Sequence, residues 1–346
     1  MKDKDIEIKN LNILIVGGAG FIGHNIAIHL NKLGAKVSII DSFQVNNLIS
    51  IVGNQDNIPF PELSQLIINE RIKILNEKKI KIFVQDARDY HSMSRIIDKE
   101  KPNVLIHLAA VSHANRSNKD PYSTFDHSLR TLENALDASK NKIDHFIYIS
   151  SSMVYGNFTK GIVDEKAICE PIGIYGALKL SGEKIVIAYN QVFDLPYTIV
   201  RPSALYGQRC ISRRVGQIFI ENALFNKDII INGDGSGKLD FTYIEDFTNG
   251  MVQIIKKPAS KNNIFNLTYG SAKSILDMVQ ILEKHFPSIK VKKTKKENLM
   301  PERGTLSVDK AKSILSYNPQ WFLEKGYSEY IAWYKDLFNK NVGLKK

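Results

Sequence analysis

The chain has 346 residues, 43% of them hydrophobic, and a net charge of +11 at pH 7. This length can bury a full core in one large domain or two joined lobes. No apolar run approaches the roughly 20 residues of a membrane helix, and the charged start does not lead into a signal peptide. Two cysteines outside any disulfide or metal spacing predict a cytoplasmic protein without a metal. The charge does not indicate a specific nucleic-acid partner, because no interleaved aromatic and basic motif is present.

The first predicted elements are a strand, a glycine-rich turn and a helix. An apolar run at residues 11–16 leads into the sequence GGAGFIG at residues 17–23, and a stretch with helical periodicity follows. Gly17 permits the tight turn, Gly20 lets the backbone approach a pyrophosphate, and Gly23 allows the helix to pack closely on the strand. The N-terminus of that helix supplies unpaired N–H groups to phosphates.

A second strand is predicted at residues 36–40 and ends at Asp41, about 20 residues after Gly20. A carboxylate at this place accepts hydrogen bonds from both ribose hydroxyls, which favours NAD over NADP. A glycine turn alone is weak evidence, since such turns also occur for packing. With Asp41 in place, the pattern indicates a dinucleotide site.

Residues 42–79 form a long connection after this second strand. We expect a loop at 51–61 and an added, solvent-facing helix at 62–75. Further strands are predicted at 81–84, 104–107, 146–149 and 197–200, alternating with helices. The alternation predicts an α/β fold with a Rossmann-type, doubly wound parallel sheet. Beyond residue 200 the pattern becomes irregular, as expected of a smaller lobe closing over a substrate.

A proton-transfer group is predicted from Tyr175 and Lys179, which project from one face of a helix at positions i and i+4. A free tyrosine has a pKa of about 10, and an adjacent ammonium with a positive nicotinamide ring would lower it. Such a pair alone could be an ordinary surface pair. The preceding strand, however, ends directly in Ser150, Ser151 and Ser152, at the edge where open α/β sheets bind ligands.

These motifs in this order resemble the extended short-chain dehydrogenase/reductases of the sugar-nucleotide epimerase/dehydratase group. The resemblance covers roughly residues 11–334 and is carried by GGAGFIG, Asp41, DARD at 86–89, HLAA at 107–110, the serines before VYG at 154–156, YGALK at 175–179, RP at 201–202, LYG at 205–207, GDGS at 233–236, DFTYIED at 240–246 and FNL at 265–267.

The resemblance implies a role for each matching residue. Tyr175 would be the base, and Lys179 would hold the nicotinamide ribose and tune Tyr175. Ser151 would bind the reacting hydroxyl, with its neighbours Ser150 and Ser152 assisting. The implied NAD contacts, besides Tyr175 and Lys179, are Gly17, Gly20, Phe21, Ile22 and Gly23 at the pyrophosphate, Asp41 at the ribose, Asp86 and Ala87 at the adenine, and Leu108, Ala109 and Ala110 along the cofactor.

Departures from the family pattern narrow the reaction. The 4,6-dehydratases carry an Asp-Glu pair where this chain has Ser152 and Met153, which cannot remove water. The decarboxylases keep a Glu at the Met153 position, so they also fit poorly. The reaction that remains is that of an NAD-dependent nucleotide-sugar 4-epimerase. In it, the C4 hydroxyl of the sugar is oxidised to a transient ketone, and the hydride then returns to the opposite face. The alternatives are a nucleotide-sugar oxidoreductase with net redox change and a non-catalytic NAD-binding protein.

The substrate side is less complete. Ala204 and Leu239 replace an Asn and an Arg that commonly contact the substrate in the family. We expect Arg303 to bind the diphosphate, with Arg213 or Arg214 replacing the missing arginine, because the arginine fork suits phosphate. Solvated surface arginines remain an alternative for those two. The sequence names neither the sugar nor the base of the nucleotide.

The sequence also predicts how the domains are divided. We expect an NAD-binding domain at residues 8–200, to which 240–262 cross back, and a substrate-binding lobe at 201–239 and 263–340. The resemblance implies a homodimer that pairs helices near residues 128–140 and 176–191. Their apolar side chains could equally be core, and these are Leu129, Leu132, Leu136, Ile185, Val186 and Ile187.

Overall fold

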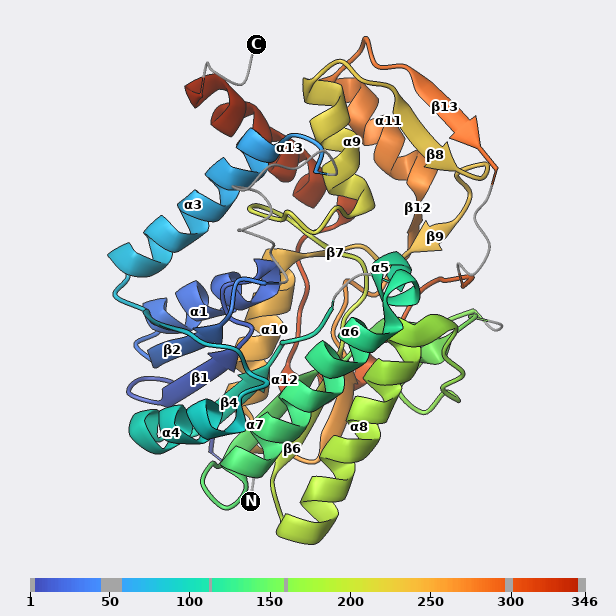
Figure 1. Ribbon diagram of the computed structural model, residues 1–346. Coiled ribbons are helices and arrows are strands. Elements are labelled where there is room, and N and C mark those ends of the chain that lie inside the picture. The colour runs from blue at the N-terminus through green and yellow to red at the C-terminus, as the bar shows by residue number, and fades with distance from the viewer. Residues whose placement is uncertain (1–3, 45–57, 112–113, 159–160, 296–300, 342–346) are drawn as a thin grey trace.

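The computed structural model describes residues 4–44, 58–111, 114–158, 161–295 and 301–341 (Figure 1). Its larger lobe is built on a seven-stranded sheet in the order β11-β6-β5-β4-β1-β2-β3, in which every pairing is parallel. The strands are β1 (Asn12–Val16), β2 (Lys36–Asp41), β3 (Lys81–Val84), β4 (Val104–His107), β5 (His145–Ile149), β6 (Tyr197–Arg201) and β11 (Asn263–Asn266). This order confirms the Rossmann-type sheet, and each predicted strand is present to within one residue.

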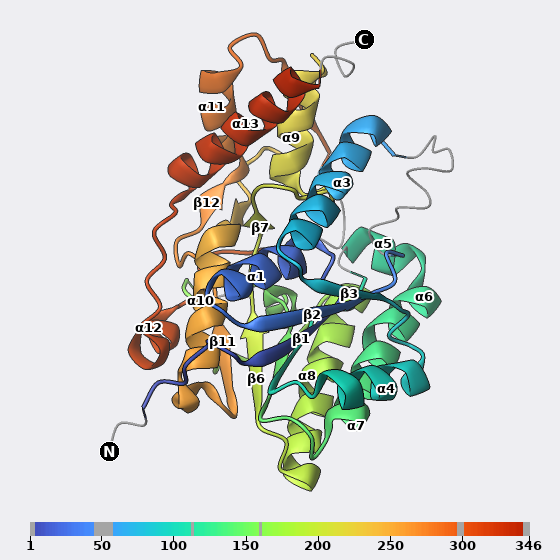
Figure 2. The same ribbon diagram turned by 90° about the vertical axis from the view of Figure 1, so that its left-hand side faces the viewer.

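Helices cover both faces of this sheet (Figure 2). Successive residues of β1 point to opposite faces, so Ile13 and Ile15 join one core while Leu14 and Val16 join the other. The first core contains side chains of α1 (Phe21–Lys32), α3 (Pro61–Glu77) and α10 (Ile244–Lys256). The second contains side chains of α4 (Tyr90–Glu100), α7 (Thr131–Ser139) and α8 (Gly173–Phe193). A sheet buried on both faces explains why its strands read as continuous apolar runs.

The smaller lobe lies above the carboxyl edge of the sheet in Figure 1. Its helices are α9 (Val215–Leu224), α11 (Ile275–His285) and α13 (Leu323–Lys340), and its short strands are β7 (Leu205–Tyr206), β8 (Ile229–Asn232), β9 (Lys238–Leu239), β10 (Thr242–Tyr243), β12 (Lys273–Ser274) and β13 (Val291–Thr294). Strand β13 pairs with β8, and β10 pairs with β7. The strands of the smaller lobe thus form separate two-stranded sheets and do not extend the main sheet.

This arrangement adjusts two sequence predictions and confirms the helix of a third. Strand β11 pairs with β6 in the main sheet, although residues 263–340 were assigned to the smaller lobe. The apolar side chains of Leu132, Leu136 and Val186 are buried in the chain's own core, so they are not free to form a dimer interface. The predicted helix at 62–75 is present as α3, while most of the predicted loop at 51–61 lies outside the described residues.

Among the described residues, no helix is both long enough and apolar enough to cross a bilayer. The remaining helices are α5 (Ala114–Lys119), α6 (Pro121–Phe125) and α12 (Asp309–Leu315), together with the short turns η1 (Asp126–Arg130), η2 (Ser152–Tyr155) and η3 (Pro258–Ser260).

Candidate active site

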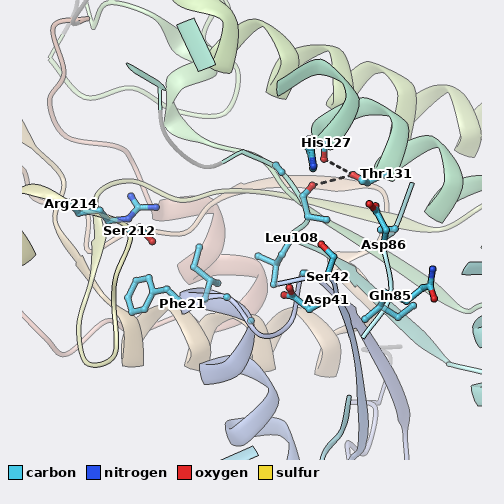
Figure 3. Close-up of a pocket in the computed structure, with 18 residues that line it drawn as sticks. Phe21, Asp41, Ser42, Gln85, Asp86, Leu108, His127, Thr131, Ser212 and Arg214 are labelled. Carbon is cyan, nitrogen blue, oxygen red and sulfur yellow. Dashed lines mark hydrogen bonds between the residues drawn. The ribbon is translucent and has the colours of Figure 1, made fainter. Parts of the chain in front are cut away.

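A pocket lies at the carboxyl edge of β1 to β4, where the glycine turn leads into α1 (Figure 3). Figure 3 shows Arg214 and Ser212 at one end, Asp86 and Gln85 at the other, and Asp41 between them. The pocket is lined by Gly17, Gly20, Phe21, Ile22, Gly23, Ile40, Asp41, Ser42, Gln85, Asp86, Ala87, Leu108, Ala109, Ala110, His127, Thr131, Ser212 and Arg214. It therefore brings together all the predicted cofactor contacts except Tyr175 and Lys179.

The glycine turn is shaped by two close backbone approaches. Gly17 has φ +80°, and a Cβ there would lie 2.8 Å from the backbone nitrogen of Ala109. A Cβ on Gly23 would lie 2.5 Å from the Cα of Gly18. Helix α1 then begins at Phe21 without a side-chain cap, so its first N–H groups are available to an anion.

Asp41 is fixed at the end of β2 by two backbone donors. Its Oδ2 accepts from the nitrogen of Ala19 at 2.9 Å, and its Oδ1 accepts from the nitrogen of Phe43 at 2.8 Å. Loss of solvent raises its pKa, and these hydrogen bonds oppose the rise. Each carboxylate oxygen keeps a further lone pair, which is what a ribose diol requires.

The opposite end of the pocket is polar. Asp86, two residues after β3, pairs with Arg88 at 2.6 Å, and Arg88 also contacts Asp126 at 2.7 Å. The hydrogen bonds from Arg88 hold the pKa of Asp86 below its usual value. After β4, the carbonyl of Ala109 accepts at 3.4 Å from Thr131, the first residue of α7 (Figure 3). The residues after β3 and β4 thus form two walls of one slot.

The catalytic candidates come from α8 and from the end of β5. Tyr175, Lys179 and Glu183 follow one another at helical spacing, so they share the face of α8 that packs against the sheet. Ser151 stands two residues after β5 with extended backbone and accepts from the nitrogen of Met153 at 3.2 Å. Its hydroxyl lies near enough to Tyr175 to lower the pKa of that phenol. The structure therefore brings Ser151 and Tyr175 together.

The ammonium of Lys179 is hydrogen-bonded to the end of β5. Its Nζ donates to the carbonyl of Ile149 at 2.8 Å and lies 5.0 Å from the ring centre of Tyr148. Burial lowers its pKa to about 8.

The pKa of Tyr175 is raised, because desolvation outweighs the groups that lower it, namely Arg214, Ser151 and Arg303. Lys179 is not among these groups, and its ammonium is held on the strand carbonyl of Ile149. Its role in tuning Tyr175 stays a prediction.

The three predicted substrate arginines have different surroundings. Arg303 donates from Nη1 to the Oγ of Ser152 at 2.9 Å, and desolvation lowers its pKa to about 10. Arg214 lines the pocket, and its buried Nε has no partner among the described residues. Arg213 instead forms an ion pair with the buried Glu221 at 2.5 Å and does not line the pocket.

A buried polar group supports the catalytic edge from behind. Ser150 donates to Glu183 at 2.5 Å, and Glu183 pairs with Arg201 at 2.6 Å. Arg201 also donates to the hydroxyl of Tyr155 at 2.9 Å, which in turn donates to Asn266 at 2.7 Å. The hydroxyl of Ser150 therefore bonds to the buried Glu183 and does not point to the reacting groups. Ser151 and Ser152, in contrast, lie beside Tyr175 and Arg303.

Several pocket residues were not predicted. Ser42 and Gln85 directly follow β2 and β3, so their place after parallel strands could have identified them. His127, Thr131 and Ser212 carry no local sequence signal, because they reach the pocket only through tertiary folding.

Comparison with known proteins agrees with this geometry. An uncharacterized UDP-glucose epimerase of Bacillus subtilis is 29% identical over 340 residues, which is 95% of this chain and 99% of the relative. UDP-glucuronate 4-epimerase 1 of Arabidopsis thaliana is 27% identical over 358 residues, which is 97% of this chain and 79% of the relative. The UDP-glucuronic acid 4-epimerase of Bacillus cereus, solved with UDP-glucuronic acid and NAD, is 28% identical with a TM-score of 0.83, covering 94% of this chain and 99% of that one.

The profile of one protein family matches residues 13–268 of the chain. This range runs from the strand before the glycine turn to the residues just after β11, and so includes the whole main sheet. The chain belongs to the NAD-dependent epimerase/dehydratase family.

Proposed function

We propose that this protein is an NAD-dependent nucleotide-sugar 4-epimerase. The observation that carries the proposal is the position of Ser151 and Tyr175 beside one another, at the sheet edge that also forms the NAD pocket. Support comes from relatives that are 4-epimerases of UDP-sugars. Further support comes from Ser152 and Met153, which supply neither the acid nor the base that dehydration needs.

The chain's own residues would divide the work as follows. Tyr175 as phenolate takes the proton from the C4 hydroxyl of the sugar while the C4–H bond breaks, and the sugar becomes a 4-ketone. Ser151 holds the reacting oxygen in line with Tyr175 throughout. In the second half, the ketone turns its other face to the pocket, and Tyr175 returns the proton to the oxygen. NAD, when bound, supplies the hydride acceptor and donor for the two halves.

Two positive charges suit the developing phenolate and the substrate. Arg214 and Arg303 both lower the pKa of Tyr175, so each favours the form that acts as a base. We propose that the same two arginines, with Ser152 orienting Arg303, bind the diphosphate of the nucleotide sugar. Arg213 takes no part in this binding, because Glu221 already pairs with it.

The proposed division of labour follows the lobes. Residues 8–200, with 240–262 crossing back, would bind NAD, and residues 201–239 and 263–340 would supply the substrate side. The exceptions are β11, which completes the main sheet, and β10, which pairs with β7 of the smaller lobe. We also propose a cytoplasmic homodimer. Its location is supported by the free thiols of Cys169 and Cys210. The dimer interface would use the partly buried Leu129, Ile185 and Ile187. Light scattering after gel filtration measures the mass of the particle and so tests the dimer.

Proton NMR of the purified protein with UDP-, GDP- and CDP-sugars, without added cofactor, tests the function. We expect one sugar to convert to its C4 epimer over many turnovers, because the hydride is returned each time. The Tyr175→Phe variant serves as the control and should give no product. If no isomer forms, yet bound pyridine nucleotide changes redox state once per site, the protein is a net oxidoreductase and the epimerase proposal is wrong.

A further inference from the structure

The sequence predicted that the inserted helix α3 faces solvent. In the structure, the helix contacts both lobes instead. Just before the helix, Phe60 stacks on Phe225 at the end of α9, with ring centres 4.1 Å apart. Along the helix, Leu63, Ile67 and Leu75 are fully buried in the core that also holds α1. Figures 1 and 2 both show α3 running from α1 toward the smaller lobe. The insertion is therefore a structural link between the two lobes.

Arg71 on this helix joins two functional segments. Its Nε donates to the carbonyl oxygen of Arg209 at 2.8 Å, and its Nη2 donates to the same oxygen. Its Nη1 lies 3.4 Å from the carbonyl of Ala19 in the glycine turn. The side chain is 1% exposed, and burial lowers its pKa to about 10. A buried guanidinium thus spans the gap between the cofactor turn and the loop at residues 207–214.

The side chain of Arg209 returns toward the first lobe. It donates to Nε2 of His24 at 3.0 Å, to Glu70 at 3.3 Å and to Asn25 at 3.3 Å. Since Nε2 of His24 accepts, its Nδ1 carries the proton and donates to the carbonyl of Gly20 at 2.8 Å. Arg209 itself has φ +63°, a left-handed conformation that the surrounding bonds must hold.

The loop that is held this way carries Ser212 and Arg214 into the pocket. We propose that Arg71 is a positioning residue for anion binding: by fixing the Arg209 carbonyl against the glycine turn, it keeps Arg214 at the cofactor pocket. The assignment rests on the proposed function in taking that anion to be the diphosphate of a nucleotide sugar. A lysine could not replace it fully, because one ammonium lacks the fork that contacts two carbonyl groups at once.

The test measures binding and turnover separately in Arg71→Met and Arg71→Lys. For each variant we would measure the Kd for UDP by calorimetry, the NAD bound per protomer, and KM and kcat for the converted sugar. We expect Arg71→Met to raise KM and the UDP Kd about tenfold, as loss of a charge-assisted contact does, with little change in kcat. Arg71→Lys should fall between this variant and the wild type. Lys73→Met, an exposed change on the same helix, is the matched control and should match the wild type.

A purely structural role for Arg71 predicts a different result. It would lower Tm but leave the UDP Kd and KM of the folded protein unchanged, and that outcome overturns the proposal. If Arg71→Met does not fold, Glu70→Gln removes one contact of Arg209 from a partly exposed position. A weaker UDP affinity at unchanged Tm then supports the assignment, and an unchanged affinity overturns it. Failure of the proposed function is distinguishable, because it leaves UDP affinity intact while no sugar is converted.

Discussion

The cofactor side and the substrate side of this site are built in different ways. On the cofactor side, the glycine turn follows β1, Asp41 ends β2, and Asp86 lies two residues after β3. Backbone nitrogens bond Asp41, and the nearby Arg88 bonds Asp86. On the substrate side, Arg214 and Arg303 stand on irregular segments that are far apart in the chain. Side chains hold those segments: Arg71 bonds the loop before Arg214, and Ser152 bonds Arg303. The first side therefore depends on local geometry, and the second on long-range contacts.

The largest expected effect lies where the two sides meet. Tyr175→Phe removes the proton acceptor while keeping the ring, so kcat should fall by about 10²–10⁴-fold, the usual contribution of a general base. NAD binding, which belongs to the cofactor side, should change little. Stopped assays of epimer formation and the NAD content of the purified variant measure the two quantities. A variant that keeps wild-type kcat would remove Tyr175 from the mechanism.

NAD binding on the cofactor side should be sensitive to changes that crowd the backbone of the glycine turn. In Gly23→Ala the new Cβ would lie 2.5 Å from the Cα of Gly18, so α1 must move away from the turn. We expect a loss of about 1–3 kcal/mol in unfolding free energy, as for other overpacked sites, together with weaker NAD binding. Denaturant unfolding and NAD titration measure these changes. Wild-type NAD affinity in this variant would contradict the tight approach of helix and turn.

The substrate side should respond through charge. Since Arg303 lowers the pKa of Tyr175, Arg303→Met raises that pKa further. The basic form is populated above the pKa, so the rising limb of the pH–rate profile should move to higher pH. We also expect kcat/KM near neutral pH to fall about tenfold as a phosphate contact is lost. Arg95→Met, on the exposed face of α4, provides the control. A profile with its limb unmoved would separate Arg303 from Tyr175.

The smallest effect should come from Arg213, next to the pocket residue Arg214. Arg214→Met should weaken binding of the nucleotide sugar, whereas Arg213→Met should leave KM unchanged. The latter loses the ion pair with the buried Glu221, whose neutral partners Gln217 and Tyr334 remain, so we expect a destabilisation of about 1–3 kcal/mol. Paired KM and Tm measurements on the two variants test this contrast. A higher KM in Arg213→Met would show that Arg213 reaches the substrate after all.

The same difference explains what the sequence could and could not predict. The six strands predicted before residue 201 are present because a strand and a turn each have a local pattern. The sequence also places Tyr175 on a helix and Ser151 after a strand, whereas Ser42 and Gln85 were missed; the roles of Tyr175 and Ser151 stay predictions. Arg71 was not found, because its partners at Ala19 and Arg209 are remote in sequence. Only the folded chain shows that the insertion belongs to the site.

The lysine shows a second limit of sequence reasoning. The spacing of Tyr175 and Lys179 correctly places both on the inner face of α8. It does not determine which acceptor the ammonium chooses, and in this structure the carbonyl of Ile149 takes it. Residues on one helical face share a direction, but the competing partners come from the strand opposite. Electrostatic roles therefore require the tertiary contacts.

The buried group formed by Ser150, Glu183, Arg201, Tyr155 and Asn266 has a consequence for divergence. Glu183 and Arg201 are both nearly inaccessible to solvent, so replacing one leaves the other as an uncompensated buried charge. Single changes at these positions should strongly destabilise the fold, while a joint replacement by well-packed apolar residues should cost little stability. We therefore expect the two positions to change together or not at all among diverging sequences.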